Sequence, residues 1–296
     1  MPCVIAIDLG GTKVTTAVVD SDGRVSGRTK RPAERGGLSA TVEQIATSVR
    51  ESIAQAGVGE VRGAGLIVPG IFSKKTGQAW APNLWGHDHV PLLTELRKKL
   101  ALPVAIDSDR AGCVLGEVWL GAARGLKDVI FLAVGTGIGA GILSDGRLVR
   151  GAGDIGGAVG WFALNPVHRE IYTQVGCWEA ESAGPGLARR LNVASAEEVV
   201  AAARSGDASA QSAIEETVRY LGMGIANLVS VFNPEMIILG GGLMQARDLF
   251  LGPIERVMRK WAQPVAAQQV RIELTQLGED AGLLGAARLA LQGAEV

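Results

Sequence analysis

The sequence of 296 residues has few aromatic residues, no excess of either charge and only three cysteines. Cys3, Cys113 and Cys177 are odd in number and far apart, which excludes a disulfide framework and indicates a reducing compartment. The formal net charge of -1 provides no basic surface for nucleic acid and no polybasic anchor for a membrane. The longest apolar stretch, Val129 to Leu143, contains four glycines and is short for a membrane span. We therefore expect a soluble, cytoplasmic protein with neither nucleic-acid nor membrane partners.

Glycine, by contrast, is abundant, with 41 residues. Many of them belong to a pattern that occurs twice: a buried strand, a turn of glycine and threonine, a second strand and an Asp-Gly-Arg hairpin. The first copy contains Gly10-Gly11-Thr12 and Asp22-Gly23-Arg24, and the second contains Gly135-Thr136-Gly137 and Asp145-Gly146-Arg147. We interpret the repeat as an internal duplication, which predicts two similar α/β lobes with a central cleft. We place a small N-terminal lobe at residues 1–118 and a large C-terminal lobe at residues 119–281.

Apolar spacing and turn signals predict the individual elements. The predicted strands are Val4–Asp8, Val14–Asp20, Val25–Thr29, Gly63–Val68, Val104–Ile106, Val129–Val134, Ala140–Leu143 and Met236–Leu239. The predicted helices are Thr41–Gln55, Leu92–Leu100, one from about Arg110, and an Ala/Leu-rich helix from Gly282. The chain is also predicted to be helical from Ala196 to about Val231. Strands and helices that alternate in this way are typical of an α/β fold.

The first candidate site follows the first strand. Asp8 ends the strand, and Gly10-Gly11-Thr12-Lys13 comes next. Glycines at this place let a phosphate approach backbone N–H groups with no Cβ in the way. Asp8 is suited to hold Mg²⁺ through a water molecule. The alternative is an ordinary glycine hairpin with Asp8 as its cap.

Two further glycine turns also end strands. Gly135-Thr136-Gly137 has neither the Lys-Ser/Thr of a Walker motif nor the following helix of a dinucleotide fingerprint. Two such turns lie at equivalent places in the duplicated lobes, so both are able to face one nucleotide. Gly240-Gly241-Gly242 allows an adenosine to lie flat against the backbone, or is simply a turn that enters a helix.

The fourth candidate is Asp107-Ser108-Asp109, after the strand that ends at Ile106. An aspartate beside a sugar hydroxyl can accept the proton as that oxygen attacks a γ-phosphoryl group. The alternative is that Ser108 or Asp109 caps the following helix, and both interpretations are compatible.

These motifs together resemble the ROK family (repressor, open reading frame, kinase) of bacterial sugar kinases and regulators. The resemblance covers almost the whole chain, in family order and spacing. Its segments are Asp8 to Lys13, Pro82-Asn83-Leu84, Asp107 to Asp109, Leu115-Gly116-Glu117, Val134 to Gly141, Gly176-Cys177-Trp178-Glu179, Leu239 to Gly242 and Asp280 to Ala287.

The resemblance implies a duplicated ribonuclease H-like fold of the actin/hexokinase kind, with ATP and Mg²⁺ as cofactors. It makes Asp109 the catalytic base, and Asn83 and Glu179 ligands of the sugar hydroxyls. It also implies a homodimer, and a final helix at about 282–296 that packs against the N-terminal lobe.

Three departures from the family pattern lie on the sugar side. The family's Glu-Asn-Asp is Asp107-Ser108-Asp109 here, so Ser108 replaces an amide that touches the sugar. The family's Gly-Glu-Ile-Gly-His is Gly157-Ala158-Val159-Gly160-Trp161, so Trp161 either stacks on a sugar face or fills the vacated volume. The family's zinc motif is Glu170 to Cys177 here and retains one cysteine, from which we expect no zinc site.

We therefore predict ATP-dependent phosphorylation of a hexose or hexose-like sugar, of the glucokinase type or with an amino or N-acetyl sugar as acceptor. The altered sugar pocket leaves a second hypothesis open, a catalytically weak sugar-binding or regulatory relative without a DNA-binding domain. The retained carboxylates Asp8 and Asp109 favour the kinase.

Overall fold

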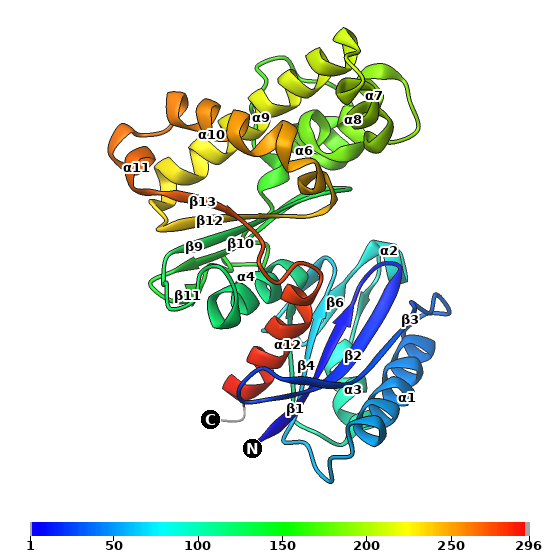
Figure 1. Cartoon of the computed structure of the whole chain (residues 1–296). Helices are drawn as coiled ribbons and strands as arrows, with labels where there is room; N and C mark the ends of the chain where they lie inside the picture. The colour runs from blue at the N-terminus through cyan, green and yellow to red at the C-terminus, as the bar shows by residue number, and fades with distance from the viewer. Residues whose placement is uncertain (1, 294–296) are drawn as a thin grey trace. The chain divides into compact units, whose positions relative to one another are not determined.

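The computed structural model describes residues 2–293 and divides them into two compact units (Figure 1). The first unit contains residues 2–125, the segment Arg150–Gly156 and residues 276–293. The second unit contains Leu126–Val149 and Gly157–Thr275. The first unit is thus assembled from three separate parts of the chain.

The first unit is built on a sheet of five strands in the order β3-β2-β1-β4-β8. β1, β2 and β3 form an antiparallel meander, and β4 and β8 run parallel to β1. The bounds of these strands are β1 (Cys3–Leu9), β2 (Lys13–Asp20), β3 (Val25–Pro32), β4 (Ala64–Val68) and β8 (Val104–Ser108). A small second sheet contains β5 (Ile71–Phe72), β6 (Ala79–Trp80) and β7 (His89–Val90).

Helices cover the sheet of the first unit on both faces. Ile5, Ile7 and Leu9 belong to a core that includes the apolar residues of α1 (Leu38–Ala56) and α3 (Leu92–Leu100). Because side chains alternate along a strand, Asp8 faces the opposite side, where α4 and α12 pack. The bounds of the helices on that side are α4 (Asp109–Leu120) and α12 (Asp280–Gly293), and the short α2 (Pro82–Trp85) follows β6.

The contact between α4 and α12 is close because glycines lie at it. A Cβ atom at Gly285 would lie 1.8 Å from the carbonyl oxygen of Gly112, so no other residue fits at position 285 without moving a helix. Glycine costs about 0.5–1 kcal/mol in a helix interior relative to alanine, and this approach of two backbones explains its presence. The last helix of the chain is therefore an integral part of the first unit.

The second unit repeats the sheet of the first. Its strand order is β11-β10-β9-β12-β13, with three antiparallel strands followed by two that are parallel to β9. The bounds are β9 (Val129–Val134), β10 (Ile138–Ser144), β11 (Arg147–Leu148), β12 (Met236–Gly240) and β13 (Arg271–Leu274). The matching order and directions confirm the predicted duplication.

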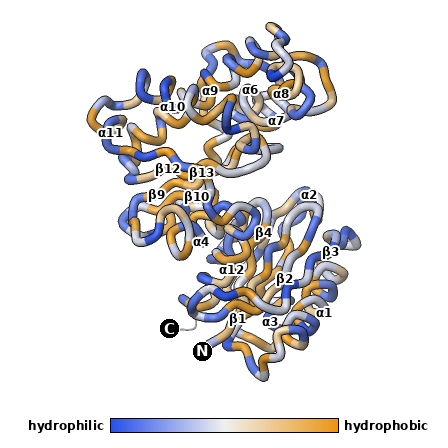
Figure 2. The backbone as a smooth tube through the Cα atoms, viewed as in Figure 1, coloured by the Kyte–Doolittle hydropathy of each residue, from blue (hydrophilic) through white to orange (hydrophobic). Residues whose placement is uncertain are grey.

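The helices of the second unit pack around one large apolar core. Hydrophobic residues run along the central strands, as Figure 2 shows, and the long helix α9 contributes many of the buried side chains. The helices are α5 (Tyr172–Val175), α6 (Cys177–Ser182), α7 (Gly184–Leu191), α8 (Ala196–Arg204), α9 (Ala208–Phe232), α10 (Arg247–Trp261) and α11 (Pro264–Gln269). Two 3-10 helices, η1 (Val159–Trp161) and η2 (Gly242–Ala246), complete the unit. Among the helices formed by residues 2–293, none has both the length and the hydropathy needed to cross a bilayer.

The sequence predictions for this unit were incomplete at two places. The segment predicted to be helical from Ala196 to about Val231 consists of two helices, α8 and α9, because Gly206 has a φ of 91° and Asp207 starts a new helix by accepting a hydrogen bond from the Ala210 amide at 2.8 Å. The prediction also assigned no element between Leu239 and Gly282, where the structure has η2, α10, α11 and β13. α10 contains a proline and β13 has only four residues, so neither gives a strong periodic signal.

Candidate active site

Acidic residues of the first unit gather at one edge of its sheet. Asp8, Ile67 and Asp107 are in register on the parallel strands β1, β4 and β8. With strands about 4.8 Å apart, the backbones of Asp8 and Asp107 are separated by roughly 10 Å. Asp109 follows at the start of α4. The structure thus brings together two motifs that lie a hundred positions apart in the sequence.

Asp109 is held at the beginning of α4, within reach of solvent. Ser108 is the N-cap of the helix, and its hydroxyl accepts a hydrogen bond from the Ala111 amide at 3.3 Å. The Asp109 side chain is 46% exposed, so a ligand can approach it. Burial by the surrounding protein raises its pKa, while the Arg110 guanidinium and the Arg110 amide oppose that shift. A fixed carboxylate with a raised pKa is the arrangement that a general base needs.

Asp8, at the end of β1, is partly buried. Burial, followed by repulsion from Asp109, raises the pKa of Asp8 to about 6, and the nearby Lys13 lowers it. No residue in the range 2–293 donates a hydrogen bond to its carboxylate. A buried carboxylate without such donors is well suited to a hydrated cation, which would lower its pKa again.

The turn after β1 lies next to one of the predicted sugar ligands. The Gly10 amide donates to the Lys13 carbonyl at 2.8 Å, which closes the turn. A Cβ atom at Gly11 would lie 3.6 Å from the Cβ of Asn83, whose side chain is exposed. The Lys13 ammonium pairs with Glu279 at 2.8 Å. Sequence reasoning assigned Lys13 to phosphate and did not anticipate this carboxylate partner.

The first unit also contains two cations near Asp107 that sequence reasoning missed. Asp107 is 5% exposed, and its Oδ2 atom lies 2.6 Å from Nη1 of Arg150 and 3.7 Å from Nζ of Lys74. The Lys74 amide also donates to Asp154 at 3.2 Å. Arg150 and Asp154 belong to the segment Arg150–Gly156, far from β8 in the sequence, and no local motif indicates the pairing.

In the second unit, Glu179 contacts the glycine turn after β9. The Gly135 amide donates to the Gly137 carbonyl at 3.0 Å, and Oε2 of Glu179 accepts from the Ile138 amide at 2.7 Å. Burial raises the pKa of Glu179 and the bond from Ile138 opposes the shift. The predicted sugar ligand therefore bonds directly to the backbone of the residue that follows the predicted phosphate turn.

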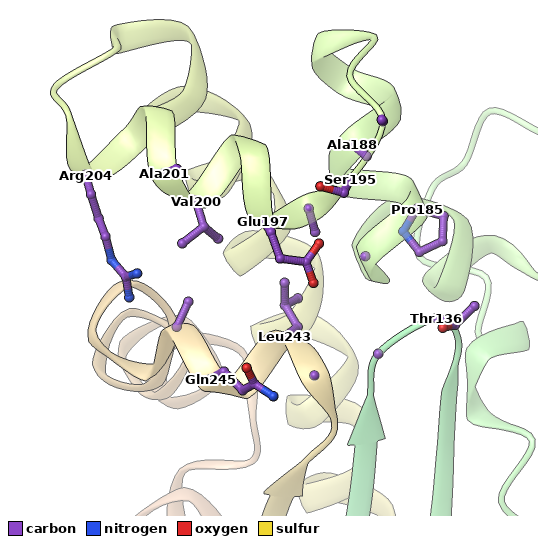
Figure 3. A pocket seen from close by; sticks show the side chains of 16 residues that line it. Thr136, Pro185, Ala188, Ser195, Glu197, Val200, Ala201, Arg204, Leu243 and Gln245 are labelled. Carbon is purple, nitrogen blue, oxygen red and sulfur yellow. The ribbon is translucent and has the colours of Figure 1, made fainter. Parts of the chain in front are cut away.

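A pocket of about 600 Å³ opens beside the same turn (Figure 3). This volume lies in the range of about 300–1,000 Å³ that small-molecule sites occupy. Gly135, Thr136 and Gly242 line it, so three of the predicted nucleotide-binding residues meet there. Gly240 and Gly241 do not line the pocket; they pack against the ring of Phe131 and the carbonyl of Val134.

Helix α8 supplies a wall of this pocket that sequence reasoning missed. Ser195, Glu197 and Arg204 line that wall, and Gln245 lies on the opposite side in η2 (Figure 3). Arg204 is already paired with Asp248 at 2.7 Å. Ser195 caps α8 by accepting from the Glu198 amide at 3.4 Å. These residues belong to no recognisable sequence motif. They are identified as pocket residues only because the fold brings α8 close to the glycine turns.

Trp161 lies at the end of η1 and is 57% exposed. The indole is therefore accessible to a ligand. The preceding residue, Gly160, is adjacent to Glu179: a Cβ atom at Gly160 would lie 3.1 Å from Oε2 of Glu179. Stacking of Trp161 on a sugar remains a prediction.

Metal-ligating residues do not cluster in the described part of the chain. No group of three or more His, Cys, Asp or Glu side chains among residues 2–293 is arranged to hold an ion. The predicted Mg²⁺ position at Asp8 needs no such group, because a cation bound with a nucleotide takes most of its ligands from phosphate and water.

Two units that repeat one mixed sheet, with glycine turns and acidic residues at the strand ends, form the two-lobed α/β fold that solved ROK hexokinases and glucokinases share. The family model "ROK family" matches residues 4–293. The chain belongs to the ROK family.

Individual relatives agree with this assignment. A glucokinase from Halalkalibacterium halodurans is 30% identical, over 97% of this chain and 94% of its own. The crystal structure of a ROK hexokinase from Thermus thermophilus has a TM-score of 0.87 at 30% identity and covers 99% of both chains. A ROK family glucokinase from Streptomyces griseus, solved with glucose and AMPPNP, has a TM-score of 0.77 at 29% identity, over 98% of this chain and 99% of its own. These solved structures confirm the predicted fold class.

Proposed function

We propose that this protein is an ATP-dependent sugar kinase that transfers the γ-phosphoryl group to a hydroxyl of a hexose or hexose-like sugar. The observation that carries the proposal is the Asp109 carboxylate, accessible, with a raised pKa and fixed at a helix start beside the strand end of Asp107. The kinases among its relatives and the AMPPNP bound to the Streptomyces griseus structure support the choice of ATP.

Each residue has a specific task in this proposal. Asp109 accepts the proton of the acceptor hydroxyl as its oxygen bonds to phosphorus and the bond between phosphorus and the ADP oxygen breaks. Asn83, Ser108 and Glu179 bind the sugar hydroxyls. Ser108 uses an oxygen lone pair for the Ala111 amide and keeps its proton to donate. Trp161, exposed on η1, offers its ring to a sugar face.

The nucleotide is held by backbone groups more than by charge. The Gly10 and Gly135 amides close the turns at Gly10-Gly11-Thr12 and Gly135-Thr136-Gly137, and the remaining N–H groups of the two turns bind phosphate oxygens. The pocket beside Gly242 takes the nucleoside, with Glu197 available as an acceptor for a ribose hydroxyl. Asp8 is suited to Mg²⁺, which, when bound, neutralises phosphate charge. We also propose a cytoplasmic homodimer.

A coupled assay for ADP tests the proposal. The full-length protein is given MgATP and a panel of glucose, mannose, glucosamine, N-acetylglucosamine and N-acetylmannosamine, with Asp109→Asn as the matched variant. We expect sugar-dependent ADP production with at least one acceptor, and a fall in kcat of about 100- to 10,000-fold in Asp109→Asn. Binding of a sugar without ADP production would favour a sugar-binding relative, and full activity of Asp109→Asn would remove Asp109 from its role.

A further inference from the structure

A buried carboxylate in the second unit takes no part in the chemistry proposed above. Glu181 on α6 is 3% exposed. Its Oε1 atom lies 2.7 Å from Nη1 of Arg169 and also accepts a hydrogen bond from the Tyr172 hydroxyl. Its Oε2 atom lies 2.9 Å from Nη2 of Arg190. We refer to Glu181, Arg169, Tyr172 and Arg190 as the Glu181 cluster.

The cluster joins several segments of the second unit. Arg169 and Tyr172 come from the segment before α6, and Arg190 comes from α7. Arg190 also pairs with Glu216 on α9 at 2.9 Å and donates to the Glu181 carbonyl at 2.9 Å. A single buried carboxylate thus joins α6 to the segment before it and to α7, and Arg190 extends the connection to α9.

The charges and protonation states of the cluster favour this attachment. Burial, followed by the bond to Glu181, raises the pKa of Tyr172 to about 12, so its hydroxyl remains a donor throughout the physiological pH range. A buried ion pair that loses one partner leaves an uncompensated charge, which is strongly unfavourable. A buried polar network in which the charged groups are paired restricts its members to one arrangement.

Helix α6 also carries Glu179, the proposed sugar ligand. It has only six residues, and so short a helix does not hold its own conformation in water. Residues two apart on a helix point to different sides, so Glu181 can be buried while Glu179 reaches the Ile138 amide. The orientation of Glu179 therefore depends on the tertiary contacts of α6.

We propose that Glu181 is a positioning residue: through Arg169, Tyr172 and Arg190 it fixes α6 so that Glu179 is oriented for the acceptor. The inference rests on the proposed role of Glu179 in sugar binding. It concerns how that carboxylate is held, whichever sugar is the acceptor.

Hydrogen exchange at the Ile138 amide reports, without a substrate, how often its hydrogen bond to Glu179 opens. In Glu181→Gln the amide should exchange roughly tenfold faster or more, because local opening then breaks its bond to Glu179. The Leu239 amide in β12 should be unchanged, which separates a local effect from general destabilisation. The matched control is Glu255→Gln, which removes a carboxylate from an exposed pair with Arg259 on α10.

Kinetics with MgATP and the sugars of the acceptor panel provide the second measurement. In Glu181→Gln we expect the acceptor KM to rise by about tenfold or more, with the KM for ATP within about twofold of the wild type. Tyr172→Phe removes only a hydroxyl and should show the same pattern more weakly, so it carries the test if Glu181→Gln does not fold.

The outcomes distinguish this inference from the proposed function. Folded Glu181→Gln protein with unchanged Ile138 exchange and unchanged acceptor KM overturns the positioning role and leaves the kinase intact. A Glu179→Gln variant with a normal acceptor KM removes Glu179 from sugar binding, and the exchange data still decide whether the Glu181 cluster orients it. Absence of ADP production with every sugar in the wild type counts against the proposed function alone.

Discussion

Replacing Asp8 by asparagine should stabilise the metal-free protein at neutral pH while it impairs catalysis. The Asp8 carboxylate faces α4 and α12, and a Cβ atom at Gly282 would lie 3.4 Å from its Oδ2 atom. Burial and the neighbouring Asp109 raise its pKa from the ordinary value of 3.8 to about 6. The folded state therefore favours the protonated form of Asp8, and an ionised Asp8 destabilises the folded state.

The sign and size of the effect follow from this difference. Below pH 3.8 Asp8 is protonated in both the folded and the unfolded states, and its protonated form fits the fold without penalty. Asp8 ionises at a lower pH in the unfolded chain than in the folded protein. The free energy of unfolding therefore falls as the pH rises from 3.8 through about 6. At roughly 1.4 kcal/mol for each pH unit between the two pKa values, the loss amounts to about 3 kcal/mol. Asparagine stays neutral at every pH, so the Asp8→Asn variant does not lose this stability.

Urea unfolding in EDTA at pH 4 and pH 8 measures this directly. Asp8→Asn should have nearly the stability of the wild type at pH 4 and exceed it by up to about 3 kcal/mol at pH 8. The exposed hairpin residue Asp22 supplies the control, since Asp22→Asn should change neither value. A variant that is no more stable than the wild type at pH 8 would refute the reasoning. Turnover with MgATP should fall in the same variant, because the proposed Mg²⁺ ligand is lost.

Three further predictions concern the second unit. Gly241 has a φ of 92°, and a Cβ atom there would lie 2.4 Å from the Val134 carbonyl oxygen; Gly241→Ala should therefore lower the free energy of unfolding by about 1–3 kcal/mol, and an unchanged urea midpoint would contradict this. Glu197→Gln should raise the KM for ATP while kcat stays close to that of the wild type, because a contact with the ribose is equally strong in the ground and transition states. A KM for ATP equal to that of the wild type would show that Glu197 does not bind the nucleotide. The purified protein should contain far less than one zinc ion per chain, and chelation should leave its melting temperature unchanged; stoichiometric zinc by metal analysis would contradict the prediction from Cys177.

Sequence reasoning recovered the parts of the fold in which local pattern and tertiary packing agree. The strand that ends at Asp8 and the strand that ends at Val134 are apolar runs followed by glycine, and both were predicted within a few residues. The repeat of glycine turn and Asp-Gly-Arg hairpin was enough to predict the duplication, since each element of the pattern has a fixed place in the sheet.

The side chains that surround the candidate site were harder to predict. Arg150 pairs with Asp107, and Glu197 lines the same pocket as Gly135, across long stretches of chain and without a motif. Exposed or paired charges of this kind are common in any sequence, so their partners become known only when the fold brings them together. The break at Gly206 was missed for a related reason: a single glycine in a helical pattern is usually tolerated.

The participation of α12 in the first unit has a consequence for biosynthesis. The glycine-mediated contact between α4 and α12 joins residues near position 112 to residues near position 285. During translation the first unit therefore remains incomplete, with the face of its sheet around Gly65 uncovered, until residues 280–293 have been made. The second unit contains no residue beyond Thr275 and can fold first. A premature stop that removes only α12 would thus damage the unit made earliest on the ribosome.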